Sequence, residues 1–357
     1  MKKSLIALAV LDASGAAMAQ SSVTLYGIAD AGVTYLNGAS NWSGVTSGNN
    51  LTSRLGFRGT EDLGGGLKAN FNLEGGFNLD TGDGGNSYAG AKAGDGFQFK
   101  RRATVGLAGG FGEVRLGREL TAAYNATARY DVFGSVGIGR SRLWEDGNVV
   151  DASANTAAVT TNQRVSNAVT YVSPKFAGFS MGVNYAFGEV AAGTSNSSYM
   201  GAGLMYDNGP LSLGLGLERL NNGTNAVLNS DIDAWSLGGS YDFGVAKLLA
   251  GYRESKVDVA TAENKRLGYY VAATAPVGAG TVRVSYNRYE NELGNVTGKA
   301  DQFAIGYVYG LSKRTSVYGT YAYLKNKNGA NLYTLGSGGL KTNGSQQGVQ
   351  VGVSHSF

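Results

Sequence analysis

Among its 357 residues the sequence has no cysteine, three prolines and one histidine, His355. Without cysteine the chain can form neither a disulfide framework nor a thiolate nucleophile. A single histidine supplies no His/Cys metal cluster and no Ser-His pair, so hydrolases and metalloenzymes lack their usual groups here. Charged residues make up only 16%, and no apolar run beyond the N-terminus approaches the ~18 residues of a membrane-spanning helix. We therefore expect neither an enzyme nor a cofactor.

The chain is rich in glycine, with 57 residues, and in tyrosine, with 21. Many turns and aromatics with almost no proline are typical of a large sheet whose strands all need their N–H donors. From Ser22 onward the run SVTLYGIADAGVTYL places Val23 and Leu25 on one face and Thr24 and Asp30 on the other. This period of two predicts a strand and excludes a helix.

The N-terminal segment, residues 1–19, has the features of a cleaved secretory signal peptide. Lys2 and Lys3 precede an apolar core, which Asp12 interrupts, and the segment ends in the small-x-small sequence Ala-Met-Ala. An amphipathic helix of the mature protein is the less favoured alternative. We expect residues 20–357 to form a single domain. Its positive charges form no cluster, which argues against binding to nucleic acid.

A hairpin unit repeats along the rest of the chain: two alternating runs joined by a short turn, then a longer polar loop. Short turns at one end and long loops at the other are typical of outer-membrane barrels. We count about sixteen strands, an even number that lets the sheet close. A ring of about that size encloses an open lumen, whereas barrels of ~8 strands are filled by side chains. The sequence thus predicts an all-β fold, a 16-stranded antiparallel transmembrane β-barrel.

The alternation also predicts which charges point into the lumen. In LTSRLGFRGTEDLGGGLKANFNLE, Arg54 and Arg58 face in, and a symmetric hairpin places Glu74 directly across from Arg54. In FKRRATVGL, Arg102 faces in, which leaves Arg101 on the lipid side unless a bulge intervenes. The inward charges at strand centres are Arg54, Arg58, Lys68, Lys100, Arg102, Arg115, Arg164, Lys247, Arg253, Arg283, Asp30, Glu74, Glu113 and Glu218. Fixed arginines in a narrow pore favour anions over cations.

The longest stretch without alternation spans about residues 119–163, far longer than an ordinary loop. It mixes aromatic residues with charges of both signs, among them Asp131. We predict that it folds into the lumen as a constriction loop. A second polar stretch, Leu79–Asn86, has the Asp and Asn spacing of a Ca²⁺ loop but lacks its final glutamate. A surface loop is therefore favoured there over a metal site.

As a set, these runs resemble the trimeric general porins of the beta-proteobacterial, neisserial type. The resemblance covers essentially the whole mature chain and is carried by the segments SSVTLYGIADAGVTY, SRLGFRGTEDLGGGLKANFNLE, FKRRATVGL, GFGEVRLGR, YDVFGSVGIG, SNAVTYVSPKFAGF, LSKRTSVYGTYAYLKNK and GVQVGVSHSF. It implies a homotrimer of sixteen-stranded barrels in the outer membrane, in contact with lipid and lipopolysaccharide. It also implies passive diffusion of small hydrophilic solutes and of inorganic and organic anions. The terminal Phe357 is implied as the signal that the barrel-assembly machinery recognises.

In that family, arginines of the barrel wall face acidic residues across the constriction. The resemblance carries this arrangement onto the wall residues Arg54, Arg101, Arg102 and Arg164 and the acidic partners Glu74 and Asp131; the inward Arg58 completes our constriction set. The loop departs from the family pattern, because DVFG has no proline after the aspartate. We expect a looser turn there.

Three other interpretations compete with a passive anion-preferring pore. A substrate-specific pore needs an arginine ladder with an aromatic slide, and Tyr124, Tyr130 and Phe133 are too few to indicate one. A non-conducting barrel with a structural or adhesive role would need a filled lumen, which the length disfavours. An enzyme would need convergent titratable groups, and His355 alone titrates near neutral pH unperturbed.

Overall fold

The computed structural model describes residues 22–84, 96–144, 163–188, 198–221, 224–225, 228–229, 231–259, 262–294, 296–330, 333–339 and 341–357. Three predictions lie partly or wholly outside these ranges: the signal peptide at residues 1–19, residues 85–86 of the polar stretch after residue 78, and residues 145–162 of the constriction loop. Within the described ranges, no helix is long and apolar enough to cross a membrane.

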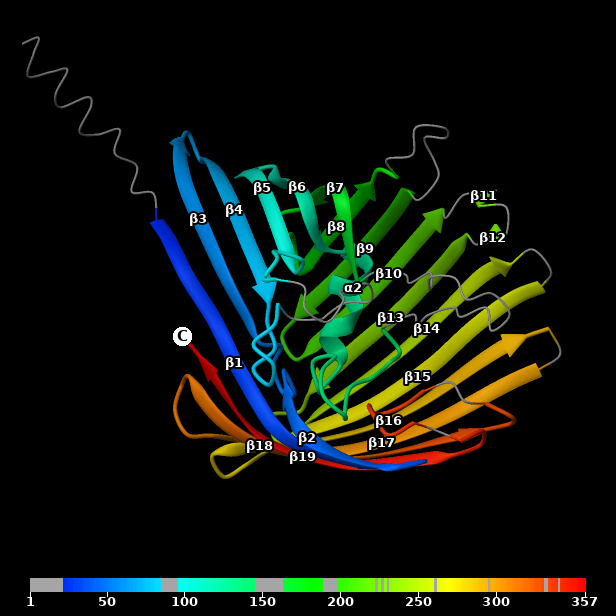
Figure 1. The fold of residues 1–357 in the computed structure, drawn as a ribbon. Helices are drawn as coiled ribbons and strands as arrows, with labels where there is room; N and C mark the ends of the chain where they lie inside the picture. Colours follow the sequence, from blue (N-terminus) through cyan, green and yellow to red (C-terminus); the bar gives the residue numbers. More distant parts are fainter. Residues whose placement is uncertain are drawn as a thin grey trace, which may run out of the picture.

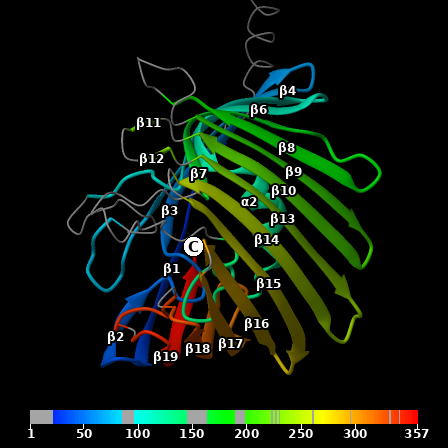
Figure 2. The same cartoon turned by 90° about the vertical axis from the view of Figure 1, so that its right-hand side faces the viewer.

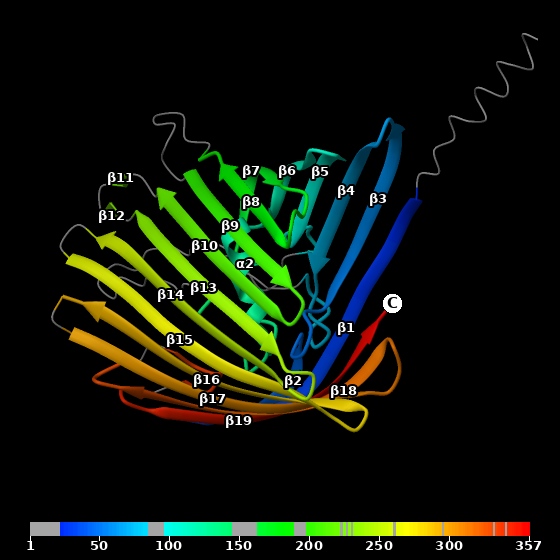
Figure 3. The same cartoon turned by 180° about the vertical axis from the view of Figure 1, so that it is seen from behind.

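Antiparallel strands close into a barrel, which confirms the predicted fold (Figures 1 and 3). In the described residues the ring has sixteen strands. β1 (Ser22–Asn37) closes it by pairing with β19 (Ser345–Ser356). The other ring strands are β3 (Arg54–Gly64), β4 (Leu67–Gly76), β5 (Arg102–Gly109), β6 (Gly112–Leu120), β7 (Arg164–Val172), β8 (Phe179–Ala186), β9 (Ser198–Asn208), β10 (Leu211–Asn221), β13 (Ile232–Asp242), β14 (Lys247–Val259), β15 (Ala262–Val277), β16 (Gly280–Leu293), β17 (Val296–Gly310) and β18 (Thr315–Lys327).

Three short strands lie outside the ring order. β2 (Asn41–Ser47) folds back on the second half of β1, while β3 pairs with the first half, so the two follow one another along one edge of β1. β11 (Thr224–Asn225) and β12 (Leu228–Asn229) form a separate two-stranded ladder. The seventeenth strand of the connected sheet is therefore β2, an addition to the ring.

The side-chain alternation follows the prediction. On β1 the outward Val23 and Leu25 are 67% and 54% exposed, whereas the inward Asp30 and Thr34 are buried. The last strand, β19, also carries exposed apolar side chains on its outward face, among them Val349. An apolar exterior and a polar interior are what a barrel needs to face lipid outside and water inside.

The register of the first hairpin differs from our prediction. From Arg54 to Asp62 the pairing is symmetric about Gly65 rather than Gly64, so that Arg54 lies across from Gly76 rather than from Glu74. The residue opposite Glu74 on β3 is Gly56, and on β5, the strand at its other side, it is Arg102. The two-residue turn between β3 and β4 is Gly65–Gly66, both with positive φ as a type I′ turn requires, and it lies beyond the centre at Gly64 that we assumed.

The loop between β6 and β7 enters the barrel, as predicted (Figures 1 and 2). Its helix α2 (Ala122–Thr127) packs on the inner side of β8, β9, β10 and β13, and η1 (Ala128–Tyr130) follows it. Thr121 caps the helix, because its hydroxyl accepts the Tyr124 N–H at 3.2 Å. Burial raises the pKa of the Tyr130 phenol, which hydrogen-bonds to a wall hydroxyl at 2.9 Å.

A second segment also turns inward, which the sequence did not predict. Residues 333–339, between β18 and β19, lie against the constriction loop. The Tyr333 ring packs on that of Tyr289 with centroids 4.6 Å apart, and Arg142 of the loop donates to the Thr334 carbonyl at 2.8 Å. The sequence around residues 333–339 is polar and rich in glycine, and it has no periodic pattern that predicts the contact with the constriction loop.

Candidate functional site: the constriction

Four of the predicted site residues meet on one sector of the inner wall. Glu74 of β4 accepts the Arg101 Nε–H at 2.6 Å, and an Arg54 Nη1 lies 3.9 Å from the same carboxylate oxygen. Arg164, the first residue of β7, donates its Nε–H to the Arg101 carbonyl at 2.7 Å. Arg101 and Arg164 lie close enough to Arg54 for their positive charges to repel its guanidinium group. Two guanidinium groups therefore bind the Glu74 carboxylate, and a third, that of Arg164, is held beside them by the Arg101 backbone, so the four side chains carry a net charge of +2 (3 − 1).

Arg101 points to the lumen side, which settles the register that the sequence left open. It precedes β5, in a segment without strand pairing, and its side chain is only 9% exposed. Its own N–H donates to the Glu74 carbonyl at 3.1 Å, so backbone and side chain bind one residue. Tyr26 of β1 donates its hydroxyl to the other Glu74 oxygen at 3.0 Å. Alternation could not reveal this, because the chain at Arg101 is not a strand.

Asp131 does not meet the arginine cluster. It is buried in the constriction loop, where its carboxylate accepts the N–H groups of Phe133, Ser135 and Ser141, each at 2.9 Å. A carboxylate that accepts several backbone N–H bonds holds a turn firmly. In this structure Asp131 therefore shapes the loop, and the looser turn that we expected from DVFG is not what we observe.

Arg283 of β16, which we had placed among the inward charges, holds the loop from the opposite wall. Its two Nη atoms donate to the Val132 carbonyl at 3.1 Å and to the Asn50 side-chain oxygen at 2.9 Å. Its guanidinium lies 4.8 Å from the centroid of the Phe133 ring. Asp30 fixes the segment that contains Asn50, because its buried carboxylate accepts the backbone N–H groups of Asn49 and Leu51.

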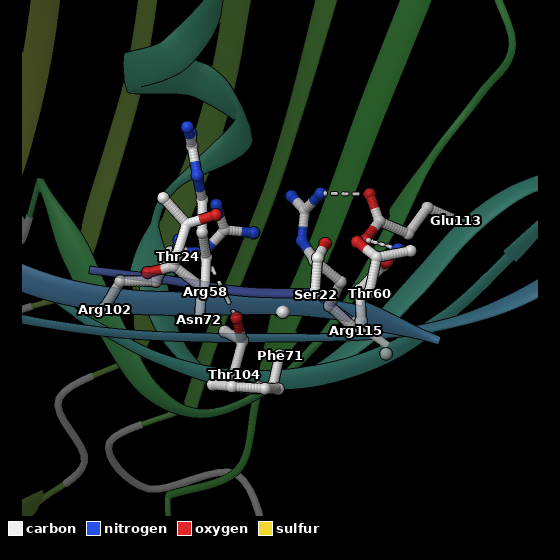
Figure 4. Close-up of a pocket in the computed structure, with 13 residues that line it drawn as sticks. Ser22, Thr24, Arg58, Thr60, Phe71, Asn72, Arg102, Thr104, Glu113 and Arg115 are labelled. Carbon is white, nitrogen blue, oxygen red and sulfur yellow. Dashed lines mark hydrogen bonds and ion pairs between the residues drawn. The ribbon is translucent and has the colours of Figure 1, made fainter. Parts of the chain in front are cut away.

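Below the cluster, towards the short turns, the wall forms an open cavity of about 420 Å³ (Figure 4). One row across four strands supplies Thr24, Arg58, Asn72 and Thr104, each directly opposite the next. In the described part of the chain no carboxylate lies within ion-pair distance of Arg58, whose guanidinium stacks 5.1 Å from the Tyr26 ring centroid.

The other two arginines of the cavity are paired. Arg115 binds Glu113 and Glu119, each at 2.8 Å, and an Arg102 Nη2 lies 3.7 Å from Glu119. Our prediction missed Glu119 because it placed the start of the constriction loop there, whereas β6 continues to Leu120 and the alternation that turns Glu113 and Arg115 inward reaches Glu119 as well. Among the described residues no group of His, Cys, Asp or Glu could hold a metal ion.

A family model described as Gram-negative porin matches residues 4–329. The chain belongs to the Gram-negative porins. This porin is 46% identical to outer membrane porin protein 32 of Delftia acidovorans over the full length of both chains. It is 34% identical to an outer membrane porin protein of Bordetella pertussis, over 91% of this chain and 95% of that one. Family and fold together place the porin in the outer membrane, where it forms a channel.

Solved structures agree with this assignment. An anion-selective porin from Comamonas acidovorans matches with a TM-score of 0.81 and 41% identity, over 95% of this porin and all of that chain. OmpT of Vibrio cholerae has the same fold, with a TM-score of 0.68 at 16% identity over 94% and 98% of the two chains. The family and its relatives are channels rather than enzymes.

Proposed function

We propose that this porin is a passive channel that prefers anions, and that it has no catalytic activity. Solutes pass between the constriction loop and the wall sector formed by β1 and β3–β7. The observation that carries the proposal is the constriction cluster, in which three arginines gather around one carboxylate: Arg54 and Arg101 bind Glu74, and Arg164 binds the Arg101 carbonyl. The anion selectivity of the matching Comamonas porin supports the same direction.

The predicted site residues take different roles in this channel. Arg54, with 24% of its side chain exposed, is the cluster member that presents its charge to the pore, while Arg101 and Arg164 set the field behind it. Arg58 and Arg102 extend the positive wall into the cavity below. Glu74 orients the cluster by binding two arginines. Asp131 acts indirectly, because it fixes the loop that forms the other side of the pore.

We further infer the assembly state and the biogenesis from the family. Residues 1–19 are a signal peptide, residues 20–357 are one barrel domain, and three copies form a homotrimer in contact with outer-membrane lipid and lipopolysaccharide. Phe357 is the signal for the barrel-assembly machinery. In support, its backbone closes the seam of the barrel: its N–H and carbonyl both hydrogen-bond to Gly27 at 3.1 Å. Small hydrophilic solutes and inorganic and organic anions are the expected cargo.

The test is the reversal potential of the refolded porin in a planar bilayer under a KCl gradient. Stepwise conductance with a reversal potential of the sign expected for a chloride-selective channel supports the proposal. A potential of the sign set by potassium would keep the channel and overturn the charge assignment. A correctly folded barrel without conductance would favour a structural or adhesive role.

A further inference from the structure

The inner wall of the barrel has two unlike halves. On β1 and β3–β7 arginines and polar side chains project into the lumen, as described above. On the half behind the constriction loop, glycines occupy inward positions instead. We call these glycines the glycine floor: Gly182, Gly203, Gly214, Gly216, Gly238, Gly251 and Gly268.

The strand register sets these glycines side by side. Gly203 of β9 pairs with Gly182 of β8 on one side and with Gly216 of β10 on the other. A second row begins at Gly214, two residues from Gly216 on β10. There, Gly238 of β13 pairs with Gly214 on one side and with Gly251 of β14 on the other. Because side chains of a strand alternate between faces, two adjacent rows of bare backbone face the lumen.

The constriction loop lies directly on this floor. A Cβ added at Gly203 would overlap the carbonyl oxygen of Ala122, and one added at Gly214 would overlap that of Ala126. The backbone of helix α2 thus contacts the backbone of the wall. Glycine within a strand marks places where another backbone approaches closely, and no other residue leaves this room.

Two aromatic rings of the loop use the same floor. A Cβ at Gly238 would overlap the ring of Tyr130, and one at Gly251 would lie 2.5 Å from the ring of Trp144. Both aromatics are buried, at 2% and 3% exposure. At α2, Tyr130 and Trp144 the loop therefore rests on wall positions that carry no side chain.

We propose that the glycine floor sets how deep the constriction loop lies in the barrel, and so sets the bore of the pore. This inference rests on the proposed diffusion path between the loop and the arginine wall. A methyl group on the floor moves the loop away from its wall by on the order of 1 Å, because carbon atoms need about 3.5–4.0 Å of separation. A loop pushed off the floor moves towards the arginine wall that faces it, so the pore narrows.

The test compares single-channel conductance in Gly238→Ala and Gly239→Ala. These positions are neighbours on β13, but Gly239 faces outward, where its Cβ would meet the far end of the Leu213 side chain at 3.0 Å and the Ser212 carbonyl oxygen at an ordinary contact distance of 3.4 Å. We expect a lower unitary conductance in Gly238→Ala and the wild-type value in Gly239→Ala. Both variants are measured after the folded barrel has been verified by its heat-modifiable mobility in SDS gels.

A second-site change separates positioning of the loop from a general structural effect. Tyr130→Ala removes the ring that the new methyl group would meet, so Gly238→Ala should no longer lower conductance when it is introduced into Tyr130→Ala. This non-additivity is the signature of direct contact. An equal decrease on both backgrounds, an unchanged conductance in Gly238→Ala, or an increase caused by release of the loop would each overturn the inference.

If Gly238→Ala does not fold, the pair Gly251→Ala and Trp144→Ala supplies the same cycle, with the same outcomes for and against. The wild-type recording separates a failure of the proposed channel from a failure of the proposed role of the glycine floor. A wild-type barrel that does not conduct refutes the proposed channel itself. A conducting wild type with no coupling between floor and loop refutes only the role of the glycine floor.

Discussion

Neutralising Arg54 tests the selectivity argument with the least structural disturbance. Its side chain is 24% exposed and its contact with Glu74 is long, at 3.9 Å. Arg101, by contrast, is 9% exposed and bound to Glu74 at 2.6 Å, so its removal would leave a buried charge without its partner. Arg54→Gln keeps a polar side chain of similar length and removes one positive charge from the pore.

The size of the effect follows from the Coulomb energy. A chloride ion passing ~4 Å from the guanidinium gains about 1 kcal/mol in water, and a potassium ion loses the same amount, a difference of about 2 kcal/mol. Screening at 0.1 M salt, with a Debye length of ~10 Å, reduces the difference to about 1.3 kcal/mol, roughly tenfold in the permeability ratio. At 1 M salt the Debye length of ~3 Å leaves about 0.5 kcal/mol, roughly twofold.

The assay is the reversal potential in planar bilayers under KCl gradients centred near these two concentrations. Arg219→Gln is the matched control, because Arg219 faces outward at the other side of the barrel and pairs with Asp231 and Asp233. We expect the control to match the wild type and Arg54→Gln to lose anion preference, more at low salt. An unchanged ratio, or a loss of equal size at both salt concentrations, would refute the electrostatic reasoning.

Three further predictions concern the loop and the seam. Asp30→Asn weakens the charge-assisted bonds to the Asn49 and Leu51 N–H groups and to the Tyr318 hydroxyl; it should cost roughly 2 kcal/mol and lower the temperature at which the folded band is lost in SDS gels. Asp131→Ala leaves three loop N–H groups without their acceptor, so we expect noisier open-channel current with little change in that temperature. Deleting Phe357 removes the seam bonds to Gly27 and should reduce the amount of folded porin in the outer-membrane fraction.

The sequence predicted most of the wall, because one physical rule governs it. Side chains of a strand alternate, one face meets lipid and the other meets water, so each apolar run also shows which polar residues point inward. Arg54, Arg58, Arg102 and Arg164 could be assigned to the lumen in this way. The rule failed at Arg101, which lies outside the strand, so two-residue periodicity does not apply to it. Glu119 obeys the rule, but we missed it because we ended its strand too early.

Inside the lumen no such rule was available. The position of Asp131 depends on backbone N–H groups up to ten residues away, which only the folded loop brings together. The glycines behind the loop were equally hidden, since 57 glycines in the sequence suggest turns before they suggest a surface. Their role becomes visible only when strand pairing places them in rows under α2. An inward arginine can be predicted from its own strand, whereas an inward glycine acquires meaning from what packs on it. For this reason the charge of the pore could be read from the sequence and its bore could not.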